Sequence, residues 1–164
     1  MNKEPQSGKK NNTIYVDVVS AEGTAFTGPA RLIVAPAVMG AIGVLPGHSP
    51  LLTRLHPGEI RIEQAEGEEA LLLYTSGGLM EVQPSLVTIL SDTALRADAI
   101  NEAAALAAKR HAEEAMLRKE SSNFDYASAQ KELAQALAQL KTLEDAKRRS
   151  RKGFNREELA HRSQ

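Results

Sequence analysis

Apolar and polar residues alternate in the first part of the chain. Ile14, Val16 and Val18 are separated by Tyr15 and Asp17. A period of two places the first three side chains on one face of an extended segment and the other two on the opposite face. The pattern therefore predicts a strand that buries its aliphatic face near the start of the chain.

Five more short apolar runs follow, separated by turn residues, at residues 31–35, 59–63, 70–74, 79–82 and 86–90. The second and third runs flank a polar turn at 65–68 and predict a hairpin. The last two predict another hairpin, with Pro84 in its turn because proline has no N–H to donate to a strand ladder. Short strands at this spacing predict an antiparallel β-sandwich over residues 13–95.

The pattern changes to a helical one after Asp92, where alanine and charged residues dominate and neither glycine nor proline occurs before Gly153. Two helices are predicted, one from about 98 to 119 with Asp98 as the N-cap, and one from about 124 to 149. The polar break at 120–123 makes residues 98–149 a helical hairpin. The fold class is therefore α+β, with a sandwich followed by an antiparallel two-helix hairpin.

The second helix carries one apolar stripe with three- and four-residue spacing, formed by Ala129, Leu133, Ala136, Leu137, Leu140 and Leu143. The facing residues expected from the first helix are Ala103, Leu106, Ala107 and Leu117. Alanine contributes little burial energy, so the hairpin is expected to be marginally stable alone. Two readings stay open: a hairpin that changes its packing, or one packed permanently against the sandwich.

Composition excludes several kinds of chemistry. The 164 residues contain no cysteine, which removes disulfides, thiolate nucleophiles and cysteine-ligated metals. Aromatic residues make up only 4%, so the core must be aliphatic. No run approaches the roughly 20 apolar residues of a membrane span. We therefore expect no direct insertion into a membrane. The polar residues 1–12 predict a disordered N-terminal extension.

Charge is distributed unevenly. Residues 1–100 carry 7 Lys/Arg and 11 Asp/Glu, whereas residues 101–164 carry 13 and 10. Most of the excess lies at 147–152, ahead of a basic C-terminal extension over 150–164. Such a cluster fits an acidic protein surface or nucleic acid, and equally a solvated terminus.

Glycine and proline cluster between residues 40 and 58, where Gly40, Gly43, Gly47 and Gly58 are expected to adopt backbone angles closed to other residues. Gly43, Pro46, Gly47 and His48 are expected to set the loop shape. The spacing matches no phosphate-binding motif. His48 and Ser49 form no nucleophile elbow, so His48 is expected to form a hydrogen bond either locally or at an interface. His56, His111 and His161 lack ligand spacing, and no metal site is predicted.

Four motifs occur in a fixed order: residues 17–22 (DVVSAE), 43–53 (GVLPGHSPLLT), 76–82 (SGGLMEV) and 87–90 (VTIL), before an alanine-rich helix. Together they resemble the epsilon subunit family of bacterial F-type ATP synthases from about Thr13 onward. The resemblance implies a non-catalytic central-stalk subunit, without a cofactor, on the cytoplasmic face of the bacterial inner membrane. A free-standing adaptor that uses its basic tail on an acidic protein or nucleic acid is the alternative.

The resemblance also implies partners. The membrane rotor ring is expected to contact Met39, Gly40, Ala41 and Ile42, although many relatives carry an acidic residue where this chain has Ala41. The gamma subunit is expected to contact Leu79, Glu81 and Asp92, although packing inside the sandwich would explain Leu79 equally well. The helical hairpin is expected to reach the catalytic alpha/beta hexamer and restrain hydrolysis through basic contacts of Arg148, Arg149, Arg151 and Lys152.

Some relatives bind ATP at the start of the helical domain through an Ile/Leu-Asp-x-x-Arg-Ala motif. The matching residues here run from Ile100 to Ala105, with Asn101 at the aspartate position and Ala104 at the arginine position. Losing the arginine removes a bidentate phosphate contact. We therefore expect no nucleotide site and no regulation by direct ATP binding.

Overall fold

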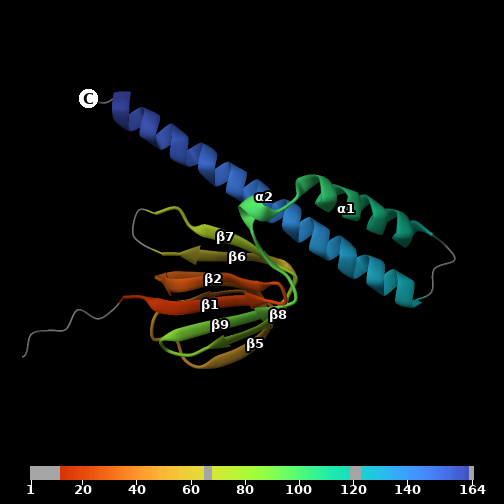
Figure 1. Cartoon of the computed structure of the whole chain (residues 1–164), viewed down its shortest axis with the longest axis horizontal. Helices are drawn as coiled ribbons and strands as arrows, with labels where there is room; N and C mark the ends of the chain where they lie inside the picture. Colours follow the sequence, from red (N-terminus) through yellow and green to blue (C-terminus); the bar gives the residue numbers. More distant parts are fainter. Residues whose placement is uncertain (1–11, 65–67, 119–122, 163–164) are drawn as a thin grey trace, which may run out of the picture.

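The computed structural model describes residues 12–64, 68–118 and 123–162, with side chains as far as Lys152. An N-terminal sheet is followed by a short helical turn and two helices (Figure 1). Most of the predicted N-terminal extension, residues 1–11, and most of the predicted turn at 65–68 lie outside the described residues.

Ten strands form the N-terminal part. They are β1 (Ile14–Ser20), β2 (Gly23–Ala30), β3 (Leu32–Ala37), β4 (Gly40–Val44), β5 (Leu51–Leu55), β6 (Gly58–Glu63), β7 (Leu71–Thr75), β8 (Gly78–Val82), β9 (Leu86–Ser91) and β10 (Ala94–Arg96). Their order is β10-β7-β6-β3-β5-β8-β9-β1-β2, and β4 pairs with β3. Since β3 meets β5 only at Ala37 and Leu55, the sheet folds there into two layers (Figure 1).

The predicted α+β class and the sandwich are confirmed, with one exception to antiparallel pairing. β1 pairs with β9 in parallel, Tyr15 opposite Leu86 and Val19 opposite Leu90. The two strands lie at opposite ends of the domain sequence. Parallel neighbours need a long connection, and the rest of the domain supplies it here.

The core between the layers is aliphatic, as the composition predicts. Ile14, Val16 and Val18 are fully buried. Both predicted hairpins form: Glu59 pairs with Tyr74 in the first. In the second, the backbone N–H of Gln83 donates to the carbonyl of Leu86 at 2.7 Å, which places Pro84 in the turn.

The glycine interpretation was only half right. Gly40 (φ +117°) and Gly47 (φ +82°) adopt left-handed angles, whereas Gly43 and Gly58 do not. Gly43 lies inside β4, opposite Val34, rather than in a shaping loop. Gly58 is needed for space, because a Cβ atom there would lie 2.9 Å from the Pro36 ring.

The helical part consists of the 3-10 turn η1 (Ala97–Ala99), α1 (Glu102–Leu117) and α2 (Asn123–Arg162). The N-cap prediction was wrong. Asp98 lies in η1, and Asn101 caps α1 by accepting a hydrogen bond from the backbone N–H of Ala104 at 3.0 Å. The second predicted boundary was also wrong, because α2 continues without a break through Gly153 to Arg162.

The interface between α1 and α2 is built from alanine. Ala105 and Ala112 of α1 and Ala129 and Ala136 of α2 are buried, with a seven-residue spacing on each helix. The facing set predicted for α1 was wrong: Ala103, Leu106, Ala107 and Leu117 are exposed, and so is Leu137 of α2. Small residues at the seam let the two helices approach closely, but they bury little apolar area.

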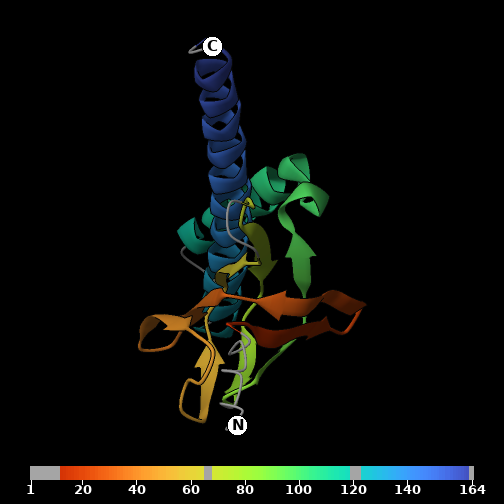
Figure 2. The same cartoon turned by 90° about the vertical axis from the view of Figure 1, so that its left-hand side faces the viewer.

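Ion pairs connect the described parts of the two helices near opposite ends of the seam. The Nζ of Lys147 lies 2.6 Å from an Oε of Glu102, and the Nδ1 of His111 lies 3.4 Å from an Oε of Glu132. α2 then crosses the sandwich layer that contains β6 and β7 and extends beyond it (Figures 1 and 2). At 40 residues and about 1.5 Å per residue, it is about 60 Å long.

Candidate partner-binding surfaces

The first candidate surface is the tip of the β3–β4 hairpin. The turn between these strands is two residues long, Val38 and Met39, and it is closed by the left-handed Gly40. Met39 is 95% exposed and Val38 is 42% exposed. The four residues predicted to contact a ring are contiguous here. Gly40, Ala41 and Ile42 belong to β4, which the sequence pattern did not reveal.

The neighbouring loop is held by hydrogen bonds of its own. The backbone N–H of Gly47 donates to the carbonyl of Pro84 at 2.8 Å, and that of His48 donates to the carbonyl of Leu45 at 3.1 Å. The Nδ1 of His48 lies 2.7 Å from the carbonyl oxygen of Ser49. His48 therefore bonds locally, one of the two predicted alternatives, and its partner is the Ser49 backbone rather than the hydroxyl.

The second surface is the outer face of the layer formed by β5, β8, β9 and β1. Leu79 is 46% exposed and lies opposite Leu90, which is 53% exposed. Leu52, 69% exposed, lies opposite Glu81 on the same face. Core packing therefore does not account for Leu79. We call Leu52, Leu79, Glu81, Leu86, Leu90 and Tyr15 the outer sheet face.

Sequence reasoning found only Leu79 and Glu81 of this face. The signal for the others was leucine at the outward positions of strands that already had an apolar inward face, such as Leu90 next to the buried Ile89. Contiguous exposed apolar residues are typical of interaction sites. The third predicted contact residue, Asp92, is exposed in the turn after β9.

Hydroxyl groups fix the start of β8 against β9. The hydroxyl of Thr75 donates to the carbonyl of Gly77 at 3.0 Å and lies 2.9 Å from that of Ser91. The Ser76 hydroxyl accepts from the backbone N–H of Thr93 at 3.0 Å. Gly78 has φ +137°, and a Cβ atom there would lie only 2.0 Å from the carbonyl oxygen of Leu90. The Ser-Gly-Gly motif thus positions Leu79 and Leu90 side by side.

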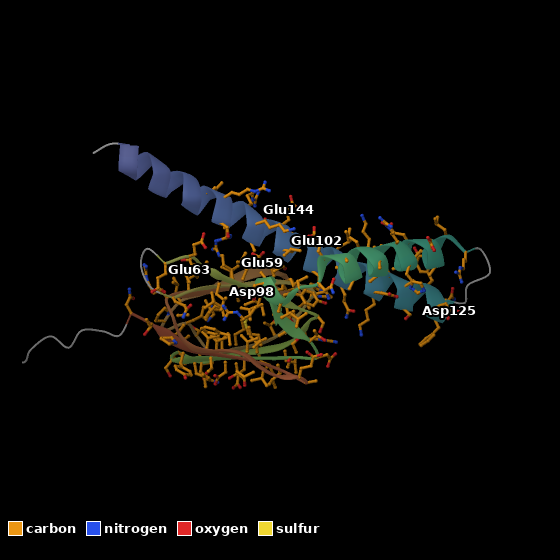
Figure 3. All side chains as sticks on the ribbon, turned by 45° about the horizontal axis from the view of Figure 1, so that its top comes forward. Glu59, Glu63, Asp98, Glu102, Asp125 and Glu144 are labelled. Carbon is orange, nitrogen blue, oxygen red and sulfur yellow. The ribbon has the colours of Figure 1, made fainter. Side chains whose placement is uncertain are left out.

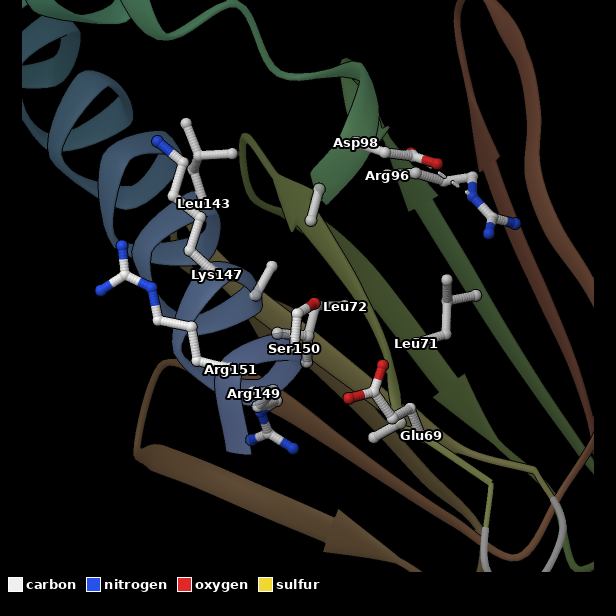
Figure 4. A pocket seen from close by; sticks show the side chains of 13 residues that line it. Glu69, Leu71, Leu72, Arg96, Asp98, Leu143, Lys147, Arg149, Ser150 and Arg151 are labelled. Atoms are coloured by element: carbon white, nitrogen blue, oxygen red, sulfur yellow. Dashed lines mark ion pairs between the residues drawn. The ribbon is translucent and has the colours of Figure 1, made fainter. Parts of the chain in front are cut away.

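The basic residues near the end of the described side chains do not form one surface. Arg148 pairs with Asp145 on its own helix at 2.7 Å. Arg148, Arg151 and Lys152 are exposed and follow the i, i+3, i+4 spacing of one helix face. Arg149 is partly buried and points away from Arg151 (Figure 4). The structure therefore separates Arg149 from the other three predicted contact residues.

α2 packs on the sandwich, an arrangement that the sequence left open, through residues that the sequence did not indicate. Tyr74 and Leu72 are 1% and 4% exposed but lie outside the sandwich core, beneath α2. Burial raises the pKa of Tyr74, and a side-chain hydrogen bond with Gln139 of α2 partly opposes this. Burial also raises the pKa of Glu59 on β6.

The interface is not closed along its whole length. A groove of about 550 Å³ runs between β7, η1 and α2, and its walls include Leu71, Asp98, Leu143 and Arg149 (Figure 4). In the described part of the chain, no three His, Asp or Glu residues are placed to hold a metal ion. None of the helices there combines the length and apolar character of a membrane span.

Two family models match consecutive parts of the chain. Residues 13–97 match the beta-sandwich domain of the ATP synthase delta/epsilon chain, and residues 98–144 match its long alpha-helix domain. The ATP synthase epsilon chain of Halorhodospira halophila is 53% identical over 141 residues, 86% of this chain and 99% of its own length. That of Nitrosococcus oceani is 55% identical over 132 residues, 80% and 93% of the respective chains.

Solved structures agree on the fold. A chain of the Euglena gracilis mitochondrial ATP synthase, from a structure of OSCP, F1 and the c-ring, superposes with a TM-score of 0.67 at 22% identity and covers 89% of both chains. A chain from the central stalk and c-ring of the Tetrahymena thermophila enzyme superposes with a TM-score of 0.52 at 10% identity, over 79% of this chain and 96% of its own. The sandwich and helical pair are thus a shared architecture.

Proposed function

Because this chain belongs to the delta/epsilon chain family of ATP synthase, we propose that it is a non-catalytic subunit of the central stalk. The family resemblance read from the sequence is confirmed by the two matching domains, whose order is that of the sandwich and the helices here. That match carries the proposal. It does not favour the free-standing adaptor.

The outer sheet face is the proposed contact with the gamma subunit. On this face Leu79 and Leu90 lie side by side as an exposed apolar pair, and Glu81 supplies a charge at the next outward position of β8, opposite Leu52. An apolar centre with a polar margin is the usual make-up of a lasting protein interface. Asp92 lies in the adjacent turn and belongs to the same proposed contact.

The tip of the β3–β4 hairpin is the proposed contact with the rotor ring. Met39 is almost fully exposed, and Gly40 and Ala41 leave the surrounding backbone accessible. With Ala41 at this position, the contact is apolar rather than electrostatic. Such a contact places the chain at the membrane surface through a partner, which we propose to be on the cytoplasmic side of a bacterial inner membrane.

The helices are the proposed brake on ATP hydrolysis. Arg148, Arg151 and Lys152 are exposed and suit an acidic segment of the catalytic hexamer, and Arg151 also lines the groove beside the sandwich. Arg149 faces the sandwich in this structure and becomes available only if α2 separates from it. No nucleotide is assigned to the helical part, where Asn101 is engaged as the N-cap.

The proposal is tested by binding to a purified gamma subunit. We expect Leu79→Glu to weaken that binding about tenfold or more, since a charge would be desolvated at the centre of an apolar contact. Leu137→Glu is the matched control, because Leu137 is also a leucine with 46% exposure but lies on α2.

Both variants should keep the circular dichroism spectrum and thermal unfolding of the original protein. If Leu79→Glu binds gamma as tightly as the control does, the outer sheet face is not the contact. If the unmodified chain itself fails to bind gamma, the central-stalk assignment is wrong.

A further inference from the structure

Charged side chains occupy the face of β6 that α2 covers. Glu59, Arg61 and Glu63 alternate along this strand with Ile60 and Ile62, which are fully buried in the sandwich core. The three charged residues therefore point away from the core, and Figure 3 shows Glu59 and Glu63 on the side where α2 packs. A charged strand face is a common outer surface, but here a helix lies over part of it.

The packing of α2 over β6 is unfavourable for the carboxyl group of Glu59. Its Oε2 atom is buried and has no hydrogen-bond partner among the described residues. A buried acceptor without a partner destabilises the state in which it is buried. No ion pair joins Glu59 to any described side chain of α2.

The charged groups around Glu59 lie on α2 and on β6, and the facing residue on β7 is neutral. On α2, Asp145 repels the carboxylate, while Arg149 and Lys141 attract it; on β6, Arg61 attracts it. On β7, Tyr74 lies directly opposite and is neutral at ordinary pH. The α2 residues at 141, 145 and 149 recur every four positions and so share one side of the helix. Docking therefore brings the carboxylate of Asp145 on α2 close to that of Glu59 on β6.

The rest of the interface gives α2 modest support. Tyr74 and Leu72 provide its apolar contacts on β7, and the groove beside them leaves part of the helix without a partner on the sandwich. Because few apolar groups hold α2 in place, one unfavourable carboxylate has a large relative effect on its docking.

We propose that Glu59 is a charge-sensitive latch: its ionised carboxylate weakens the docking of α2 on the sandwich, and neutralising it tightens that docking. The latch lies entirely within this chain and does not depend on the partner contacts proposed above. It is therefore tested on the free protein, and its failure would leave the central-stalk assignment untouched.

The direction of the pH effect follows from linkage. Burial first, and Asp145 second, raise the pKa of Glu59 above its ordinary value of 4.5 when α2 is docked. The docked state thus holds the proton more tightly than the released state. The contribution of Glu59 to docking is therefore most favourable below pH 4.5, is lost as pH rises from there through the raised pKa, and is constant above it.

The distance between the sandwich and α2 measures docking. The chain contains no cysteine, so Ser85→Cys and Lys152→Cys give two unique, exposed positions for a pair of fluorescent labels. Between pH 4.5 and about 7, we expect the docked-to-released ratio to fall about tenfold for each unit by which docking raises the pKa of Glu59.

In the same labelled chain, Glu59→Gln should remove this pH dependence and hold the ratio at its low-pH level. Glu144→Gln is the control, since it removes one carboxylate from an exposed position beside Asp145 on α2 and should keep the original profile. Arg149→Gln should lower the docked fraction, because it removes an attracting cation.

Three results would overturn the latch. One is a distance that does not change with pH in the original protein. Another is the same pH profile in Glu59→Gln as in the original protein. The third is a titration midpoint at or below pH 4.5 for Glu59, measured in the full chain by nuclear magnetic resonance of its carboxyl carbon. This measurement does not need the Glu59→Gln variant, so it tests the proposal even if that variant does not fold.

Discussion

At the scale of single residues, glycines have two different roles that the sequence does not distinguish. Gly78 combines a left-handed φ of +137° with a space in which a Cβ atom would meet the carbonyl oxygen of Leu90 at 2.0 Å. Gly43 has an ordinary strand conformation, and a Cβ atom there would lie 3.6 Å from Leu32. The first cannot be replaced without moving backbone, whereas the second can.

We therefore expect Gly78→Ala to destabilise the sandwich by several kcal/mol, about 3 or more, through backbone strain and displacement of β9. Gly43→Ala should change stability by no more than about 0.5 kcal/mol. Urea unfolding followed by circular dichroism compares the two. Equal stability of the two variants would mean that β8 and β9 adjust their pairing without cost.

At the scale of elements, alternation predicted a strand only where one face was clearly apolar. β1, the β6–β7 hairpin and the β8–β9 hairpin satisfied that condition and were found. β2, β4, β5 and β10 were missed. In the first three, glycine, alanine and threonine weaken the pattern and outward leucines such as Leu52 break it, and β10 has only three residues. No local sequence pattern predicts the parallel pairing of β1 with β9, because that pairing depends on how the whole sheet folds.

Helix boundaries and faces failed for different reasons. The second helix was predicted to end at about residue 149, but α2 continues through Gly153, since a glycine in a helix costs only about 1 kcal/mol relative to alanine. In α1, alanines occur on every side, so periodicity could not decide between Ala107, which is exposed, and Ala112, which is buried. The candidate surfaces were predictable only where the family resemblance identified them. Packing of the hairpin on the sandwich was one of two open interpretations, but no sequence pattern identified the residues of that interface.

The alanine seam gives a prediction at this scale. Ala112→Leu should destabilise the packing of α1 on α2 by about 1–3 kcal/mol, because a closely approached seam has no room for three more carbon atoms. Ala107→Leu makes the same change at an exposed position of α1 and should stay within about 0.5 kcal/mol. Hydrogen exchange of the helix amides measures both. Faster exchange in the Ala107→Leu variant than in Ala112→Leu would contradict the seam as described.

At the scale of the whole molecule, the sandwich and helices meet through two acids, Glu59 and Tyr74, both of which disfavour ionisation when α2 is docked. For Tyr74, burial is the larger cause, and the bond with Gln139 opposes it. The docked state again has the higher pKa, so its contribution to docking is complete below the ordinary value of 10.0 and is lost as pH rises through the raised value.

Tyr74→Phe separates this effect from that of Glu59. The variant keeps the ring that α2 covers but lacks the ionisable hydroxyl and its bond with Gln139, so docking at neutral pH should weaken by about 1 kcal/mol. Above about pH 10 its docked fraction should stay flat where that of the original protein falls. The distance between fluorescent labels at positions 85 and 152 measures docking in both ranges of pH.

Because Glu59 and Tyr74 titrate in widely separated ranges of pH, Tyr74→Phe should leave the change in docking at acidic pH unaltered. If Tyr74→Phe changed the pH profile in both the acidic and the alkaline range, Glu59 and Tyr74 would report one unfolding event of the sandwich rather than the release of α2.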